Sequence, residues 1–420
     1  MKVIIVGSGL LGLTTAYYLR RGGAEVCVVD RRPGPGLETS FANGGMLHAS
    51  QANPWNEPGI LGAAIKMLGR EGAALLIRAK ALPAMLGWGY HFIRESRPHR
   101  YVENLSKNAR LARYSLNALA EIRNDIEINY DQKTSGTIKM LRTQEGFENA
   151  LRFCDRFDQL EIPYEICDVA ALIKLEPALG PIEHELAGAL YFPSDEVGDA
   201  YKYCQSLYRW CRDNGVDFNF DRNAREFRQR NGAIEALLCD EDELKADSYV
   251  VACGSYSPLL AKSAGVALPI QPVKGYSITV PVGEWQQPPE IAVIDDQMHA
   301  AVCPLGDRLR VAGTAEFAGF DCNITPSRIR NLISLLQNVY PQFMPYFNES
   351  SLERWTGLRP MTYDGVGIVS GTAIDNLYVN AGHGHLGWTM APGSGKALGE
   401  LMLGQRSELA IGDYSVARFA

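Results

Sequence analysis

The feature that most constrains this 420-residue chain is a glycine-rich turn near its N-terminus, between a predicted strand and a predicted helix. Residues 2–6 form a short β-branched run typical of a buried parallel strand. Gly7, Gly9 and Gly12 follow at once as G-x-G-x-x-G, a helix is expected over 13–21, and an apolar strand over 25–29 ends at Asp30. This order, with an acid 18 positions after the last glycine, indicates a dinucleotide-binding unit.

Each glycine of this turn has a mechanical role in such a unit. Gly7 permits the tight turn, Gly9 lets a pyrophosphate approach the backbone, and Gly12 lets the helix pack closely on the strand. The N-terminus of the helix then presents free N–H groups to the anion. The contacts expected around this turn are Val6, Gly7, Gly9, Leu10, Leu11 and Gly12.

Asp30 is expected to accept hydrogen bonds from the adenosine ribose of the dinucleotide. The next residues, Arg31 and Arg32, raise the alternative of NADP, since arginine can bind a 2′-phosphate. Asp30 would repel that phosphate, so the arginine pair is interpreted as a solvated loop. Arg31 is kept among the expected cofactor contacts because it directly follows Asp30.

Composition excludes several classes of protein. The formal net charge of -7 argues against a protein whose main task is to bind nucleic-acid phosphates. The nine cysteines form no CxxC pair and are interpreted as scattered reduced thiols. His383 and His385 have no further ligand nearby in the sequence, so no metal site is predicted. Neither a signal peptide nor an apolar run of about 18 residues is evident, and we expect a cytoplasmic location.

The rest of the chain mixes strands and helices without a clean domain boundary. Strands are predicted over 136–141, 163–167, 188–192, 216–220, 247–253, 270–281, 307–316 and 377–380. Helices are expected over 104–128, 200–214 with Asp199 as N-cap, 324–340 and near 395–403. Asn231-Gly232 predicts the turn of a hairpin over 226–243. We therefore expect two domains that exchange segments.

Five segments identify a family resemblance in addition to the N-terminal unit. They are the loop 37–45 (LETSFANGG), the segment 272–277 (PVKGYS), the run 355–362 (WTGLRPMT), the ending 382–391 (GHGHLGWTMA), and 413–418 (DYSVAR). Together they resemble the bacterial D-amino acid dehydrogenases of the small-subunit type, flavoproteins of the D-amino acid oxidase/glycine oxidase superfamily. The similarity extends from the first residue to the C-terminal region.

The resemblance implies FAD and a two-domain fold. It implies an α/β fold with a doubly wound FAD-binding domain, interleaved with an α+β substrate domain built on an antiparallel sheet. On this basis we assign residues 1–75, 197–268 and 352–420 to the FAD-binding domain. Residues 76–196 and 269–351 are assigned to the substrate domain.

FAD is long, so small-residue loops far from the first turn must hold its ring. One candidate is the loop with Ser40, Asn43, Gly44 and Gly45, and a second is the strand end at Cys253 and Gly254. The third is the glycine-rich segment 382–387 with the helix after it, where we expect contacts from Gly384, His385, Leu386, Gly387, Trp388 and Thr389. A helix N-terminus there would stabilise the negative charge that grows on the reduced ring. In some members of the family that the chain resembles, a cysteine near the C-terminal sheet binds the flavin covalently. This chain has no cysteine after Cys322, so the resemblance implies noncovalent FAD.

Three residues are predicted to form the substrate site. Arg359 matches the family's carboxylate-binding arginine, a residue type whose planar fork binds carboxylates bidentately. Tyr276 matches a pocket tyrosine whose hydroxyl could assist that anchor, with a core tyrosine as the alternative. His48 follows the loop 37–45, here named the flavin loop, and is a candidate for the pocket wall or for a structural role.

The resemblance implies oxidative deamination of D-amino acids to 2-oxo acids and ammonia. Hydride would pass to flavin N5, and the electrons to a quinone-linked acceptor. A dehydrogenase of D-proline or D-hydroxyproline and an oxygen-using glycine or D-amino acid oxidase are close alternatives. A nicotinamide-dependent dehydrogenase and a redox-silent, flavin-binding subunit of a hetero-complex are the alternatives from other classes.

The stretch 60–100 is strongly basic. It holds seven basic residues, Lys66, Arg70, Arg78, Lys80, Arg94, Arg97 and Arg100, against only Glu71 and Glu95, among apolar and aromatic residues. This composition suits peripheral contact with an anionic inner membrane. A helix packed on the substrate domain with a solvated basic rim is the alternative.

Overall fold

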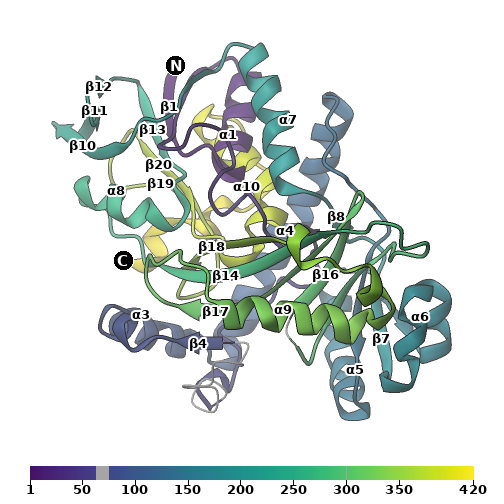
Figure 1. Cartoon of the computed structure of the whole chain (residues 1–420). Coiled ribbons are helices and arrows are strands. Elements are labelled where there is room, and N and C mark those ends of the chain that lie inside the picture. The colour runs from purple at the N-terminus through teal and green to yellow at the C-terminus, as the bar shows by residue number, and fades with distance from the viewer. Residues whose placement is uncertain (63–74, 299) are drawn as a thin grey trace.

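The computed structural model describes residues 1–62, 75–298 and 300–420. A six-stranded sheet has the order β19-β20-β13-β1-β2-β9 (Figure 1). Its strands are β1 (Lys2–Val6), β2 (Glu25–Val29), β9 (Asp217–Asn219), β13 (Ser248–Val251), β19 (Ile368–Gly371) and β20 (Leu377–Ala381). All neighbouring strands are parallel except β19, which pairs antiparallel with β20.

Side chains on the two faces of this first sheet pack into two separate hydrophobic cores. Val3, Ile5 and Val250 pack under the helices α1 (Leu10–Arg21), α7 (Ala200–Asp213) and α10 (Gly387–Met402). Ile4 and Val251 face α8 (Ser257–Ser263) and a three-stranded sheet of β10 (Ala224–Arg230), β11 (Ala233–Cys239) and β12 (Glu243–Leu244). The apolar runs form strands because both faces are buried, and the predicted doubly wound fold is confirmed.

A larger, mostly antiparallel sheet forms the second layer. Its order is β18-β14-β17-β16-β15-β5-β7-β6, with β4 beside β17. The strands are β4 (Leu75–Ile77), β5 (Thr137–Leu141), β6 (Glu165–Cys167), β7 (Gly188–Phe192), β14 (Ile270–Pro281), β15 (Ala292–Asp295), β16 (Ala300–Leu305), β17 (Arg308–Phe317) and β18 (Glu353–Thr362). A short pair, β3 (Met46–Leu47) with β8 (Glu196–Val197), lies apart from both sheets.

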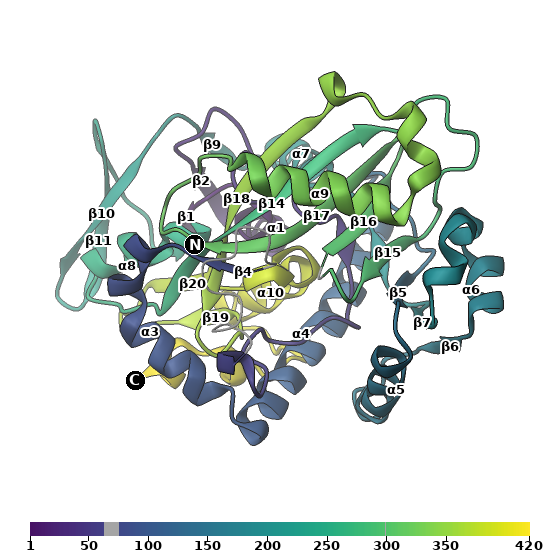
Figure 2. The same cartoon turned by 60° about the horizontal axis from the view of Figure 1, so that its bottom comes forward.

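Helices complete the second layer. Figure 2 shows α9 (Pro326–Val339) along one side of the second sheet, with α3 (Leu82–Glu95) on the other side. The buried residues of α9 join those of the sheet in one core, while Trp88 of α3 packs with Val273 and Phe317 on the opposite face. The remaining helices are α4 (Pro98–Asp125), α5 (Gln144–Gln159) and α6 (Val169–Leu175).

Two predicted domain assignments differ from the structure. The segment 353–362 was expected in the FAD-binding domain, but as β18 it pairs with β14 from Ile270 to Thr279 in the second sheet. The helix α4 was expected in the substrate domain, yet its residues Leu111 and Leu119 share the core of α1 and α10. Both errors concern long-range contacts, which a local sequence pattern does not contain.

The last long helix begins earlier than predicted. A helix was expected near 395–403, but α10 begins at Gly387 and includes Pro392. Its glycines serve close packing, because a Cβ at Gly393 would lie 2.7 Å from Ser115 Cα and a Cβ at Gly395 would lie 2.8 Å from the main-chain carbon of Thr14. Contacts with α1 and α4 therefore override the low helix propensity of glycine.

We predict opposite effects for two glycine-to-alanine substitutions in helices. Gly395→Ala should lower the free energy of unfolding by about 1–3 kcal/mol, because the added methyl group overlaps α1. Gly87→Ala in α3 should raise it by about 0.5–1 kcal/mol, because no atom lies within 4 Å of the new Cβ. Urea unfolding of the two holoenzymes measures both changes, and equal shifts of the midpoint would contradict this packing.

Candidate active site

A cavity of about 1220 Å³ lies at the carboxyl ends of β1, β2 and β13 and extends over the second sheet. Ligands bind at this edge in open α/β sheets. The volume exceeds the usual range of about 300–1,000 Å³ for small-molecule pockets, which leaves room for a large cofactor and a second ligand. The predicted cofactor contacts that line it are Val6, Gly7, Gly9, Leu10, Leu11, Asp30, Arg31, Ser40, Asn43, Gly44, Cys253, Gly254, Gly384, His385, Gly387 and Trp388.

The glycine turn is too tight for any other residue at two positions. Gly7 has a φ of +111°, and a Cβ there would lie 2.4 Å from the carbonyl oxygen of Ala252. A Cβ at Gly12 would lie 1.9 Å from the carbonyl oxygen of Gly7. Gly9 is the N-cap of α1 and has no side chain that could bond the first N–H groups of the helix. The N-terminus of α1 faces the cavity, because Gly9, Leu10 and Leu11 line it. This cradle fits a pyrophosphate group.

The acid and the arginine after β2 are both held in place. The Asp30 carboxylate accepts hydrogen bonds from the main-chain N–H and the hydroxyl of Ser8, each at 2.7 Å. Arg31 donates to Glu38 at 2.7 Å, and its guanidinium carbon lies 3.9 Å from the ring centre of Tyr256. The Arg31 side chain is 36% exposed, as the interpretation of a solvated loop requires, and it also forms part of the cavity wall.

Four predicted cofactor contacts do not line the cavity. Gly12 packs on Gly7, as described above. Gly45 faces the second sheet, since its Cβ would lie 3.1 Å from Cys303 Sγ. Leu386 is buried in the core of the first layer, and Thr389 is buried with its hydroxyl accepting a 3.2 Å hydrogen bond from the main-chain N–H of His48. Leu386 and Thr389 thus support neighbouring segments of the cavity wall.

The start of α10 supplies a second helix N-terminus. Leu386 caps it without a side-chain hydrogen bond, and Gly384, His385, Gly387 and Trp388 line the cavity beside it. The positive end of the helix dipole favours negative charge on a bound group. Together with the cradle at Gly7, this arrangement fits the pyrophosphate and the flavin ring of a flavin dinucleotide.

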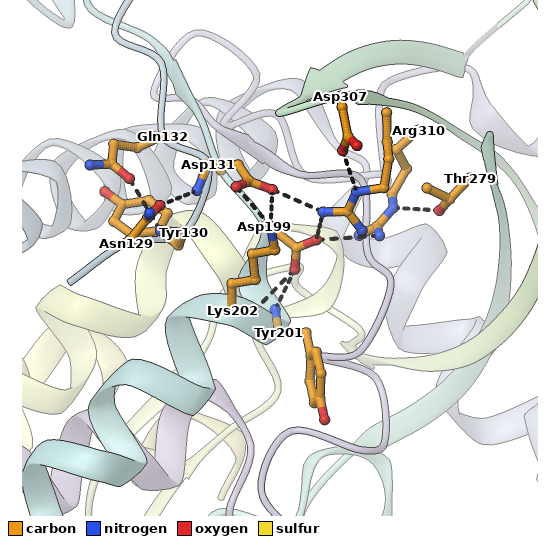
Figure 3. A network of polar contacts seen from close by, with 12 residues as sticks. Asn129, Tyr130, Asp131, Gln132, Asp199, Tyr201, Lys202, Thr279, Asp307 and Arg310 are labelled. Carbon is orange, nitrogen blue, oxygen red and sulfur yellow. Dashed lines mark hydrogen bonds and ion pairs between the residues drawn. The ribbon is translucent and has the colours of Figure 1, made fainter. Parts of the chain in front are cut away.

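The second sheet holds the flavin loop. Ser277 donates to the carbonyl of Ala42 at 2.6 Å, and Arg310 donates to the carbonyl of Asn43 at 3.4 Å. Figure 3 shows Arg310 between Thr279, to which it donates at 3.0 Å, and Asp199, which lies 3.6 Å away. Asp199 caps α7, as predicted, by accepting from the N–H of Tyr201 at 2.9 Å. This network connects the two layers at the flavin loop.

Arg359 lies over β14 with its guanidinium against Gly275. A Cβ at Gly275 would lie 2.5 Å from the guanidinium carbon, so only glycine leaves room for it. Arg359 donates to the carbonyl of Thr314 at 2.9 Å and lies 5.4 Å from the ring centre of Trp55. Burial lowers its pKa to about 10, and within the described residues no acidic side chain pairs with it. An enclosed cation without a counter-ion is suited to bind an anionic ligand.

Two histidines complete this end of the cavity. His385 stacks on Trp55 with ring centres 5.2 Å apart, and His48 also lines the cavity. Burial lowers the pKa of His48 to about 4 and that of His385 to about 3, so both imidazoles are neutral at physiological pH. They add polarity to the site without adding charge.

Tyr276 lines the cavity, as expected of a pocket tyrosine, but its hydroxyl is bonded away from Arg359. Its hydroxyl donates to Glu316 at 2.5 Å and also bonds Thr325 at 3.0 Å. Neighbouring residues of a strand point to opposite faces, so Tyr276 points toward α9 while the guanidinium of Arg359 lies over Gly275 on the other face. Tyr276 belongs to the core beneath α9.

Three residues of the site were not predicted from the sequence. Thr39 and Ser255 donate hydroxyl hydrogen bonds to the carbonyl of Leu358, at 2.9 and 3.0 Å. Trp55 packs between His385 and Arg359. A glycine inside a strand, such as Gly275, is a signal of close approach that could have located Arg359, whereas nothing in the sequence distinguishes Trp55 from a core residue.

Comparisons with known proteins agree with this geometry. Residues 2–401 match the model of the family DAO, described as FAD dependent oxidoreductase. A D-amino acid dehydrogenase of Allorhizobium ampelinum is 41% identical over 420 residues, which cover 100% of this chain and 99% of that protein. Two solved structures share the fold. The L-proline dehydrogenase of P. horikoshii is 18% identical with a TM-score of 0.77, covering 100% of this chain and 97% of that one. The glycine oxidase of Bacillus cereus is 19% identical with a TM-score of 0.75, covering 98% and 97%.

Proposed function

The chain belongs to the FAD-dependent oxidoreductase family, on its D-amino acid dehydrogenase branch, and from this premise we propose that it oxidises D-amino acids to 2-oxo acids and ammonia. The observation that supports this activity most strongly is the Arg359 guanidinium, which is enclosed in the cavity without an acidic partner among the described residues. A substrate carboxylate would supply the missing negative charge through two parallel hydrogen bonds.

The residues of the cavity have separate tasks in this reaction. FAD supplies the hydride acceptor when it is bound. Arg359 holds the carboxylate, and the neutral rings of Trp55, His48 and His385 form the surrounding wall. Since both imidazoles have lowered pKa values, neither adds a positive charge that would compete with Arg359 for the carboxylate. The chain thus orients the substrate and excludes water from the reacting carbon.

We also propose that FAD is bound noncovalently. Among the described lining residues, Cys253 is the only cysteine. Burial raises the pKa of its thiol to about 12, so it stays protonated and is a poor nucleophile at neutral pH.

Replacing Arg359 tests the proposed function. Arg359→Met should lower kcat/KM for D-alanine by about 100-fold or more, the loss expected for a buried charged hydrogen bond of about 3 kcal/mol. The flavin absorbance per protein should stay unchanged, because Arg359 lies away from the dinucleotide turn. The control is Arg354→Met on the same strand, which removes an exposed pair with Glu349 at 3.0 Å. Equal kcat/KM values for the two variants would contradict the role of Arg359.

The second part of the proposal concerns the acceptor and the surface of α3: electrons pass to a quinone-linked acceptor, and α3 contacts an anionic membrane. Leu82, Leu86, Tyr90 and Ile93, here named the α3 stripe, are exposed by 43%, 72%, 65% and 43%. Their spacing of four, four and three residues puts them on one face of the helix. Exposed arginines follow it at Arg94, Arg97 and Arg100.

An apolar face beside basic residues suits an anionic lipid surface. Within the ranges that the structure describes, no helix has the length and apolar character needed to cross a bilayer. Of the other basic residues predicted for this surface, Lys66 and Arg70 lie outside the described residues. Arg78 and Lys80 pair with Glu316 at 2.6 Å and with Asp321 at 3.4 Å.

Flotation with liposomes tests the membrane contact. The wild-type holoenzyme should float with phosphatidylglycerol vesicles at low salt, and Leu86→Asp should weaken this binding by about tenfold or more, because a buried leucine contributes about 1.5–3 kcal/mol. Ile166→Asp is the matched control, since Ile166 is 55% exposed on β6, the edge strand of the second sheet at the end away from β18. Binding that is equally strong in Leu86→Asp, or absent in the wild type, would refute the contact.

A further inference from the structure

The cavity has an arm with a different character from the rest. Leu75, Ile77, Met85, Trp88, Phe92 and Ile93, here named the apolar arm, line it, and all of them except Ile93 belong to one hydrophobic cluster. Trp55 packs in one cluster with Leu75, Ile77, Met85 and Phe92, and the same Trp55 lies over Arg359. The apolar arm therefore begins beside the candidate substrate site.

The apolar arm ends at the protein surface. Ile93 lines the cavity and is also 43% exposed as a member of the α3 stripe. One face of α3 thus lines the cavity while the other faces outward, and both faces are apolar. An exposed apolar helix face is typical of a surface that contacts a ligand, a partner or lipid. The end of the apolar arm at the protein surface therefore suits a ligand that enters from an apolar medium such as a membrane.

Aromatic rings dominate the middle of the apolar arm. Trp88 and Phe92 are stacked, with ring centres 4.9 Å apart and planes inclined by 20°. The indole N–H of Trp88 is already bonded to the carbonyl of Pro269 at 3.1 Å, so the arm presents ring faces and edges without a free donor from this indole. Flat neutral rings pack well against such surfaces.

The opposite end of the cavity is charged. Lys139 and Asp296 line it as an ion pair at 2.7 Å, and Asp296 is 41% exposed there. An amino acid, which carries two charges in water, loses less hydration at this end than in the apolar arm. The two ends therefore favour ligands of opposite polarity.

We propose that the apolar arm binds the electron acceptor, a lipid-soluble quinone, with its head group toward Trp55 and its tail toward the α3 stripe. This inference rests on the proposed function and adds the site at which the acceptor binds. A charged dinucleotide or a redox protein does not match an uncharged arm with aromatic walls. A quinone is neutral, planar and apolar, and it takes up two electrons together with two protons.

The complete reaction balances with a quinone as acceptor. One amino acid, one quinone and one water give one 2-oxo acid, one ammonium ion and one quinol. The Cα–H hydrogen leaves with its electron pair, by way of FAD, and an N–H proton is released, which leaves an imine. The quinone takes up the two electrons and two protons, and water replaces the imine nitrogen by oxygen.

A pair of glycines in α3 allows a matched test. Gly89 lines the cavity and Gly87 does not, and no atom lies within 4 Å of a Cβ built at either residue. Gly89→Phe should therefore fill the apolar arm, while Gly87→Phe adds the same side chain to the same helix outside it. Both variants are compared as holoenzymes in steady-state assays with decylubiquinone and with water-soluble phenazine methosulfate.

Gly89→Phe should raise KM for decylubiquinone by about tenfold or more, in the range that steric changes in an apolar pocket produce. Its kinetics with phenazine methosulfate and its anaerobic flavin bleaching by D-alanine should match the wild type. Gly87→Phe should match the wild type in all three assays. Quenching of tryptophan fluorescence by decylubiquinone, which needs no turnover, should weaken in Gly89→Phe alone.

Each other outcome overturns a stated part of the account. Unchanged KM and unchanged quenching in Gly89→Phe would show that the apolar arm does not bind the acceptor. Slower bleaching by D-phenylalanine, with normal quinone kinetics, would assign the arm to the substrate side chain instead. If no D-amino acid bleaches the wild-type flavin, the proposed function fails, and the quenching assay still decides whether a quinone binds in the arm.

Discussion

The carbonyl oxygen of Leu358 connects the two halves of this molecule at the point where function needs them connected. It belongs to β18 of the second sheet, and it accepts hydrogen bonds from Ser255, after β13 of the first sheet, and from Thr39 of the flavin loop. Arg359 is the next residue along β18. The distance between Arg359 and the glycine turn at Gly7 is therefore set by the hydroxyl hydrogen bonds of Thr39 and Ser255 and by the pairing of β18 with β14.

The buried charges on the two faces of β14 differ in whether they have an acidic partner. On the face toward α9, the buried Lys274 lies 3.6 Å from Glu316, which also pairs with Arg78 at 2.6 Å. On the cavity face, Arg359 has only the carbonyl of Thr314 and the ring of Trp55 among its described contacts. A buried charge without a partner lowers the stability of the folded protein. At Arg359 a bound anionic ligand would remove this penalty. This contrast between two faces of one strand marks the substrate site.

The local sequence pattern predicted the dinucleotide-binding turn and most of the residues that line the cavity around it. The turn at Gly7 requires a positive φ and a close approach of Ala252, and both constraints lie within a strand–turn–helix unit that the sequence displays. The errors concern contacts between distant segments. Tyr276 was placed beside Arg359 because both match family motifs, but the alternation along β14 directs it to the opposite face.

The glycines of α10 illustrate a different difficulty. The last helix was expected near 395–403, whereas α10 begins at Gly387, and α4 and α1 approach it at Gly393 and Gly395. Gly45 resembled a flavin contact but packs on the second sheet. In each case the same residue type serves a turn, a ligand or a packing contact, and only the neighbouring element decides which.

The central claim is that Arg359 recognises the carboxylate of a D-amino acid. Anaerobic bleaching of the visible flavin band by D-alanine, compared with D-alaninamide, tests it most directly, because the amide replaces the carboxylate by a neutral group of nearly the same size and shape. D-Alanine should bleach the wild-type flavin rapidly, and D-alaninamide should fail to do so at the same concentration. Equal bleaching by both compounds would contradict the account.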